Sequence, residues 1–338
     1  MATRVKSNYA IKLDKDLETI HTVESGDEII IEAVNAYGEH FKNLNELMDL
    51  VDGKYGDKHH HPLTGPIDIN GAEPGDVLKV KIDDINIELA AQALSKSAGI
   101  SPIEARMFGD RAPVIATVEN NKKIKYMNGM YVDYKPMLGI IGVAPENGFI
   151  KTGHAGKTGG NLDIPFITKG CTVYIPIEVA GGKLFIGDTH AAQGYGELGG
   201  IALEASAEVR CKIEVLKLRQ GIKFNNIVVI GDEPLTGEKA IGIVGVAKSF
   251  QNLNEAVYDS YLGAGDIVSK LLPTINKNYV FNVVTVIGHS MNGQAFSKTS
   301  ESTSIVNILE KDLRILKKDI RLNILNEFES IMFKGDRL

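Results

Sequence analysis

The stretch AEPGDVLKVKID, residues 72–83, combines a tight turn with a strand. Proline fixes φ and glycine accepts a positive φ, so Pro74-Gly75 predicts a turn. After the turn, Leu78, Val80 and Ile82 alternate with polar residues, which is typical of a strand with one buried face. The stretch therefore predicts a β-strand that is entered from a turn.

Similar runs recur on both sides of this stretch. Each is rich in β-branched residues and bounded by turn residues, as strands are. Gly181-Gly182 lies between two of these runs and predicts a hairpin turn. The spacing favours a mainly β fold, a sandwich or jelly roll, over a doubly wound sheet. The predicted strands cover residues 28–33 (EIIIEA), 76–83, 138–144, 172–179, 184–187, 208–217 and 226–230.

The pattern changes near residue 250. Apolar residues at helical spacing predict a helix over 253–271, and residues 279–287 read as another buried strand. Apolar residues from Ile305 to Phe328 predict one long amphipathic helix. We expect its apolar stripe to pack on the chain's own sheet, with a partner subunit as the alternative. The sequence thus predicts a β-rich body over 1–235 and a C-terminal α/β portion over 236–338.

Composition excludes several classes of protein. The chain has 338 residues, of which 43% are hydrophobic and 24% charged, as in folded domains rather than disordered chains. Its formal net charge of -6 argues against a dedicated nucleic-acid binder. No apolar run reaches the roughly 18 residues of a membrane helix, and no leader opens the chain, so we expect a cytoplasmic protein. Cys171 and Cys211 are too few for a disulfide framework or a cysteine-based zinc site.

The stretch GDTHAAQGYGELGGIALE, residues 187–204, carries the strongest chemical signal. Asp188 and His190 are two residues apart, so on an extended segment both side chains leave the same face. A carboxylate and an imidazole on one face form a plausible half of a metal site. Glu197 follows a flexible glycine pair and could fold back to the same point, and Glu204 extends the cluster. The alternative is that the acids cap turns and His190 is a core histidine.

A second polar group stands upstream in GGNLD, residues 159–163. Glycines let the backbone approach a ligand closely, so Gly160 and Asn161 are candidates for substrate contact. Asp163 could complete the coordination of a metal. An Asx-type turn is the alternative explanation.

Two further candidates are less well supported by pattern. Of His59, His60 and His61, the last precedes a proline and is held extended, so His61 is the best placed to point inward. An exposed loop is the alternative. Glu32 lies in the apolar EIIIEA run, where an inward side chain would need a partner or a metal. An outward, solvated position is the other choice.

These motifs resemble the acetamidase/formamidase family. The matching stretches are HPLTGPIDINGAEPGDVL (61–78), PMLGIIGVAP (136–145), GGNLD (159–163) and GDTHAAQGYGELGGIALE (187–204), and their order fits across roughly residues 20–230. The resemblance implies a jelly-roll-like β-sandwich that forms homo-oligomers, binds a divalent metal and hydrolyses small amides to a carboxylate and ammonia. Residues 153–158 and the chain after 250 depart from the family, which leaves the identity of the amide open.

Roles for the candidate residues follow from this resemblance together with their chemistry. Asp163, Asp188 and His190, joined by Glu32, would hold the metal, which would acidify a water and polarise the amide oxygen. Glu197 would act as the general base, and His61 would donate to the developing oxyanion. Zinc suits the histidine and is favoured, whereas calcium or magnesium suits the carboxylates.

Three other functions stay open at this point. A cyclic amide or lactam would need much the same chemistry in a different pocket. A non-catalytic binding module could keep the metal as a structural clip, and an oligomer-building protein could use the predicted 305–328 helix as its interface. None of these readings involves nucleic acid or a membrane.

Overall fold

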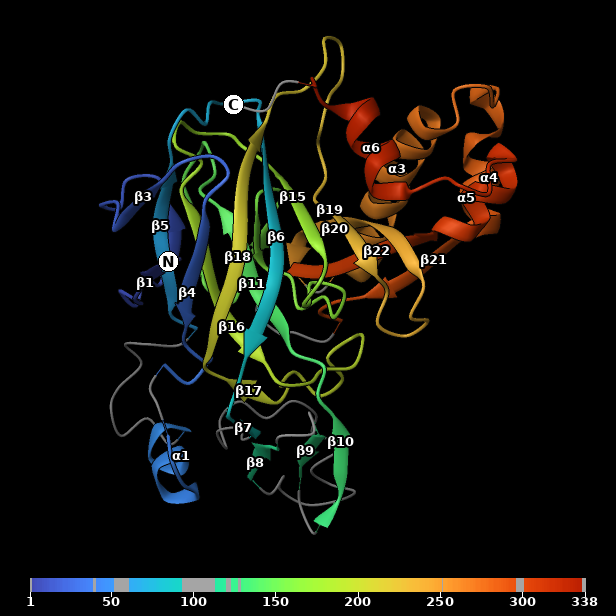
Figure 1. Ribbon diagram of the computed structural model, residues 1–338. Helices are drawn as coiled ribbons and strands as arrows, with labels where there is room; N and C mark the ends of the chain where they lie inside the picture. Colours follow the sequence, from blue (N-terminus) through green and yellow to red (C-terminus); the bar gives the residue numbers. More distant parts are fainter. Residues whose placement is uncertain are drawn as a thin grey trace.

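The computed structural model describes residues 2–38, 41–51, 61–92, 113–119, 123–126, 129–250, 252–295 and 301–335. This part of the chain is mostly strands, which form two large sheets (Figure 1). The mainly β class that the sequence predicts is therefore confirmed. A jelly-roll path of the strands stays a prediction.

The first sheet contains the strands predicted over 28–33, 76–83, 172–179, 208–217 and 226–230. Most neighbours in it run antiparallel; the exception is the edge strand β1, which is parallel to β4. The strand order of this first sheet is β1(Thr3–Val5), β4(Glu28–Ala33), β18(Ala207–Leu216), β6(Val77–Asn86), β15(Thr172–Pro176), β19(Val228–Asp232), β20(Lys239–Phe250), β22(Glu301–Leu309) and β21(Gly288–Asn292).

The second sheet contains the strands predicted over 138–144 and 184–187. Within this sheet, β5(Leu63–Ile69) pairs with β16(Leu184–His190) and with β3(His21–Val23). A separate small ladder joins β2(Lys12–Asp14) to β12(Phe149–Lys151). The main strand order is β10(Tyr131–Asp133), β9(Lys123–Lys125), β8(Val114–Val118), β7(Leu89–Gln92), β17(Glu204–Ala205), β16(Leu184–His190), β11(Met137–Val143), β14(Gly159–Asn161) and β13(Ala155–Gly156).

The main hydrophobic core takes side chains from both sheets. Ile31 of β4 and Val80 of β6 come from the first sheet, and Ile141 of β11 and Ile186 of β16 come from the second. All four are fully buried. Burial of this apolar surface, worth about 25 cal/mol per Å² of area removed from water, holds the two sheets together.

Most of the helices gather at one end of the first sheet, beside β20, β22 and β21, whereas α1(Leu44–Val51) lies apart from them (Figure 1). α3(Leu253–Leu271) matches the predicted helix, and its N-cap Asn252 accepts the backbone N–H of Glu255. A second core forms beneath these helices and includes Ile243 and Phe328. The other helices are η4(Lys277–Tyr279), α4(Val280–Ile287), α5(Glu310–Lys317) and α6(Ile324–Met332).

The predicted long helix over 305–328 is wrong. Residues up to Leu309 belong to β22, which is followed by the two short helices α5 and α6. β22 is buried on both faces, because Ile305 and Leu309 pack in the main core and Val306 and Ile308 pack in the second core beneath the helices. Its apolar residues are therefore nearly continuous rather than alternating. The helix α5 then ends at Lys318, whose φ of 54° is left-handed.

Two smaller predictions also need correction. Residues 279–287 form η4 and α4 rather than a strand, and the buried residues of α4 are Val280 and Val284, one helical turn apart. Gly181-Gly182 does make a turn, but it is not a hairpin, because β15 before it and β16 after it lie in different sheets. The run over 279–287 was ambiguous without its tertiary context. The strands on either side of Gly181-Gly182 were predicted correctly, and only their pairing was wrong.

The boundary near residue 235 falls between two strands that pair with each other. β19 and β20 are antiparallel neighbours, from Val228 opposite Ile243 to Asp232 opposite Lys239. The first sheet thus continues across the predicted boundary, and the division into 1–235 and 236–338 stays a prediction. None of the helices in the described ranges is long and apolar enough to cross a membrane.

Candidate metal and catalytic site

Five of the polar side chains singled out by the sequence come together at one end of the second sheet. Asp188 and His190 end β16, and Glu204 begins β17, where it lies opposite His190 in the antiparallel ladder. Asp163 follows β14, and Glu197 lies in the loop between β16 and β17. Strand pairing thus brings together segments that are far apart in the chain.

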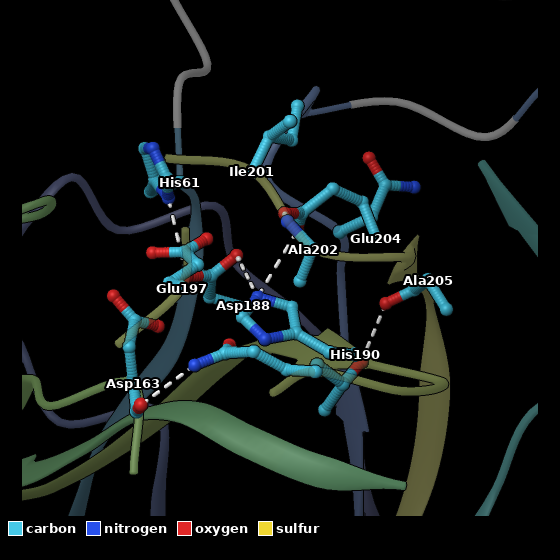
Figure 2. Close-up of polar contacts among 12 residues, drawn as sticks. His61, Asp163, Asp188, His190, Glu197, Ile201, Ala202, Glu204 and Ala205 are labelled. Atoms are coloured by element: carbon cyan, nitrogen blue, oxygen red, sulfur yellow. Dashed lines mark hydrogen bonds and ion pairs between the residues drawn. The ribbon is translucent and has the colours of Figure 1, made fainter. Parts of the chain in front are cut away.

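The contacts within this cluster centre on His190 and Asp188 (Figure 2). The Nε2 atom of His190 lies 3.5 Å from Asp188 Oδ1 and 3.2 Å from Glu204 Oε2. On the other side of Asp188, its Oδ2 atom lies 3.3 Å from His61 Nδ1. Asp188 therefore sits between two histidines.

Two sets of three side chains have ligand atoms close enough to hold one cation. Asp163, Asp188 and His190 form the first set, and its ligand atoms lie within 4.8 Å of one another. His190, Glu197 and Glu204 form the second set under the same limit. All five residues are buried, whereas 34% of the His61 side chain is exposed. His61 therefore marks the more accessible side of the cluster.

The backbone of the cluster is in an unusual conformation. His61, Asp163, Asp188 and Glu197 have φ values of 50°, 48°, 51° and 41°. Such left-handed geometry is uncommon for residues other than glycine, and it costs roughly 1 to 2 kcal/mol per residue. The surrounding hydrogen bonds hold it; for example, the N–H of Asp188 donates to Val34 O at 3.1 Å. Strained residues of this kind concentrate at functional sites.

The left-handed backbone of Asp188 differs from the extended segment on which we based the prediction that Asp188 and His190 share one face. Asp188 and His190 both contribute to the cluster, as predicted, but Asp188 is not extended. Its side chain is aimed by a left-handed kink within β16 rather than by regular alternation. The spacing thus predicted correctly that both side chains meet, although the cause is the left-handed backbone of Asp188, which the sequence does not reveal.

Burial sets the charge state of the acids. It is the main reason why the pKa of Asp163 is raised well above its usual range, with the charges of Glu197 and Asp188 adding to it. Burial likewise raises the pKa of Glu204, and it raises the pKa of Glu197 to about 7. For Asp188, burial also acts upward, but the charges of His61 and His190 outweigh it and hold the pKa below its usual range.

The histidines show the opposite balance. Burial by itself would lower the pKa of His190, but the charges of Glu204 and Asp188 raise it well above its ordinary value. The pKa of His61 is raised in the same way, by the charge of Asp188 against the effect of burial. The cluster thus gathers more carboxylates than its two imidazoles neutralise, an arrangement that a bound cation would stabilise.

Several buried polar atoms of the cluster lack a hydrogen-bond partner, as the ligand atoms of a metal site do when the metal is left out. Within the described ranges, Asp163 Oδ1 and His190 Nδ1 are buried and make no hydrogen bond. The buried oxygens Asp188 Oδ1 and Glu204 Oε2 lie near His190 Nε2 but also lack a hydrogen bond of good geometry. Buried polar atoms are normally hydrogen-bonded, so an unpaired group of them needs an explanation. Carboxylate oxygens and an imidazole nitrogen are ligands that divalent cations take in proteins. The cluster can therefore hold a metal ion.

Gly139 of β11 leaves space for two of these carboxylates. A Cβ at this position would lie 2.7 Å from Asp163 Oδ1 and 2.8 Å from Asp188 Oδ2. The carbonyl of Gly139 also accepts the N–H of Asp163 at 3.1 Å. The glycine therefore lets β11 pass directly beneath the candidate ligands.

We expect Gly139→Ala to lower metal binding, because the added methyl group would push both carboxylates out of place. Overpacking of this kind destabilises by about 1 to 3 kcal/mol. Metal content after dialysis and the thermal unfolding midpoint would measure both effects. Gly194→Ala is a matched control, since a Cβ at Gly194 meets nothing within 4 Å. Equal metal content in Gly139→Ala and Gly194→Ala would contradict the expectation.

Glu32 is not brought to the cluster. Its neighbours Ile31 and Ala33 are in the main core, so alternation along β4 turns Glu32 to the other face of the sheet. There its Oε2 accepts the N–H of Ser7 at 3.0 Å. Among the described residues, neither candidate set of ligands includes it. The ligand set drawn from the sequence is corrected accordingly.

The two predicted substrate contacts have structural partners. Asn161 Nδ2 donates to Asp163 Oδ2 at 2.7 Å, so Asn161 orients a candidate ligand. Gly160 has a φ of 116°, and a Cβ there would lie 2.4 Å from His154 O, so the glycine permits β13 and β14 to pair. Contact of either residue with substrate stays a prediction. His59 and His60 lie outside the described residues.

Two site residues were not predicted. Gln193 Nε2 donates to the carbonyl of Asp163 at 2.7 Å. Gln294 Nε2 donates to Glu197 Oε2 at 3.1 Å. Gln193 lies inside the 187–204 motif and could have been considered, whereas Gln294 lies outside the motifs, where no sequence pattern marks it.

The fold and the buried cluster define a mainly β protein with a candidate metal centre. A model of the acetamidase/formamidase family matches residues 5–155 and 149–303. The chain therefore belongs to this family, and the resemblance carried by its sequence motifs is confirmed. The expected departure from the family after residue 250 is corrected, because the match continues to residue 303.

Individual relatives agree with this assignment. A formamidase of Methylophilus methylotrophus is 26% identical over 268 residues, which are 62% of this chain and 63% of the relative. The crystal structure of a predicted acetamidase/formamidase from Thermoanaerobacter tengcongensis is 26% identical, with a TM-score of 0.76 and coverage of 95% of this chain and 99% of that one. An acetamidase structure from Bacillus halodurans, 24% identical over 93% of this chain and 99% of that one, has the same fold with a TM-score of 0.79. The match spans 63% of the length of each curated relative.

Proposed function

We propose that this chain is an amidohydrolase that converts small linear amides, of the formamide and acetamide type, to a carboxylate and ammonia. The observation that carries the proposal is the buried cluster of Asp163, Asp188, His190, Glu197 and Glu204, which contains two sets of three ligand atoms that lie within 4.8 Å of one another. Its position in a member of the acetamidase/formamidase family supports amide hydrolysis as the reaction.

Asp163, Asp188 and His190 are the residues that would hold a divalent cation, with Glu204 as a further ligand or a partner of His190. Zinc is favoured because an imidazole is among the ligands, and calcium or magnesium would suit a set dominated by carboxylates. When bound, such a cation lowers the pKa of water and polarises a carbonyl oxygen. The bound cation would also balance the excess negative charge of the buried carboxylates.

Glu197 is the residue best suited to move the proton. Attack of the water oxygen on the amide carbon requires that the water lose a proton, and cleavage of the C–N bond requires that the nitrogen gain one. A carboxylate within hydrogen-bond reach of both can do this. Glu197 is buried and lies in the second candidate set with His190.

His61 has a different role in the proposal. It is more exposed than the other members, and its Nδ1 atom is held by Asp188. An amide that enters from the accessible side would meet His61 first. Its ring is therefore placed to donate a hydrogen bond to the oxygen that becomes negative during attack.

Assembly and location also remain proposals. We propose a cytoplasmic homo-oligomer that uses neither nucleic acid nor a membrane. Ile315 and Ile320, at and just after α5, are 73% and 86% exposed, as residues that contact a partner subunit would be in an isolated chain.

The test of the proposed function is a panel of amides with both products measured. We expect formamide or acetamide to yield ammonia and the matching carboxylate in equal amounts, and we expect a lactam and a dipeptide to be poorer substrates. Failure of every linear amide in the panel, with metal bound, would contradict the proposal.

A further inference from the structure

The short segment that follows β21 enters the site from the C-terminal part of the chain. Gly196 and Gln294 form an isolated bridge between parallel segments. The N–H of Gly196 donates to Asn292 O at 2.7 Å, and the N–H of Ala295 donates to Gly196 O at 3.3 Å. These bonds attach the segment to the loop that carries Glu197.

The side chain of Gln294 joins both halves of the cluster. Its Nε2 atom donates to Glu197 Oε2 at 3.1 Å. Its Oε1 atom accepts from Asn161 Nδ2 at 3.2 Å, and the same Nδ2 atom donates to Asp163 Oδ2 at 2.7 Å. Gln294 is buried, with 8% of its surface exposed. One carboxamide thus connects the candidate base to the residue that orients a candidate ligand.

Chemistry fixes the orientation of this carboxamide. A carboxylate only accepts hydrogen bonds, so the amide nitrogen of Gln294 faces Glu197. The Asn161 amide nitrogen only donates, so the amide oxygen of Gln294 faces Asn161. A glutamate at this position would instead present an oxygen to Glu197.

The backbone of Gln294 is held firmly by β22. Its N–H donates to Thr303 Oγ1 at 2.7 Å, and Thr303 Oγ1 donates to Leu162 O at 2.6 Å, next to Asp163. Gly293 permits this close approach, because a Cβ there would lie 2.3 Å from both Leu162 O and Thr303 Oγ1. The segment is therefore built to bring one side chain to the cluster.

We propose that Gln294 is a positioning residue, which holds the Glu197 carboxylate in the orientation that proton transfer needs. The inference rests on the proposed function, because it assigns Glu197 the proton. It also gives the part of the chain after residue 250 a direct share in the site.

Gln294→Met keeps the length of the side chain and removes both hydrogen bonds. We expect kcat to fall by about 10- to 100-fold, the range that one hydrogen bond to a charged group is worth. KM and metal content should stay unchanged, because no candidate ligand is removed. Gln294→Glu should lose at least as much, since it keeps the length but has no donor for Glu197.

Ser304→Ala is the matched structural control. Ser304 is buried in the same strand pair, and its Oγ donates to Met291 O at 3.0 Å, away from Glu197 and Asn161. We expect Ser304→Ala to lower the unfolding midpoint and leave kcat unchanged. If Ser304→Ala lowers kcat as much as Gln294→Met does, the effect belongs to general stability and the inference is wrong.

A double-mutant cycle separates positioning from structure. In a Glu197→Gln background, Gln294→Met should cause no further fall in kcat, because the group that it orients has been removed. An equal fall in both backgrounds would overturn the inference. A crystal structure of Gln294→Met gives a readout that needs no activity: Glu197 should turn away from its wild-type position, and an unmoved Glu197 would also overturn it. Wild-type protein with no amidase activity would instead refute the proposed function itself.

Discussion

Asp188→Asn is expected to remove both metal binding and amide turnover while the fold remains. The substitution keeps the shape of the side chain but replaces one carboxylate oxygen by a donor nitrogen. That nitrogen would face His61 Nδ1 or His190 Nε2, which lie 3.3 Å and 3.5 Å from the two oxygens of Asp188. Either histidine would then lose its acceptor.

We expect turnover to fall by more than about 100-fold, the upper end of what is lost when a residue that only supports a metal ligand is replaced. Elemental analysis, ammonia release and thermal unfolding would measure the three properties. Asp76→Asn is a matched control, because Asp76 is also a buried aspartate and is paired with Lys217. Wild-type metal content in Asp188→Asn would show that Asp188 is not a ligand.

Glu197→Gln is expected to separate catalysis from metal binding. The glutamine has the same size and can still contact Gln294, but it cannot take a proton from water. Because general acid–base catalysis contributes about 10²- to 10⁴-fold, kcat should fall within that range. Metal content should stay close to wild type, since Asp163, Asp188 and His190 remain.

The control for this variant is Glu214→Gln, which changes another buried glutamate, one that is paired with Lys79 at 3.0 Å. It should alter stability alone. Measurement of kcat, KM and metal content for both variants would decide the matter. A Glu197→Gln protein that keeps wild-type kcat would remove Glu197 from the mechanism.

The pH profile gives a second view of Glu197. The pKa of its carboxyl is raised to about 7 by burial, and a nearby cation would lower it again. A base works only when deprotonated, so kcat/KM should fall as the pH drops through this pKa. We expect the acid limb of the wild-type profile at or below about pH 7 and expect it to be absent or displaced in Glu197→Gln. An acid limb unchanged by the substitution would assign it to another group.

Much of the β-rich body could be predicted, because its strands have local signatures. The EIIIEA run and the strand after Pro74-Gly75 are found where their patterns place them. The structure of residues 305–328 could not be predicted, because Ile305 and its neighbours lie in a strand that is buried on both faces. A continuous apolar run of that kind satisfies a helical period and a strand equally well until the neighbouring strands are known.

The site residues, too, could be predicted only where the sequence carries a local motif. Asp163, Asp188, His190 and Glu197 stand in motifs, and the structure places them together. Glu32 was misjudged because the sequence does not tell which face of β4 meets the core. Gln294 has no motif at all, since its part in the cluster depends on how β21 and β22 meet the loops around Gly196 and Leu162.

We propose that the buried cluster is a metal-dependent centre for amide hydrolysis. The most direct test of this proposal is the metal content of the purified protein, together with ammonia release from formamide and acetamide before chelation, after chelation and after return of the metal. We expect stoichiometric metal, loss of ammonia release on chelation and recovery when zinc or another divalent cation is restored. Full release from protein stripped of metal would contradict the proposal.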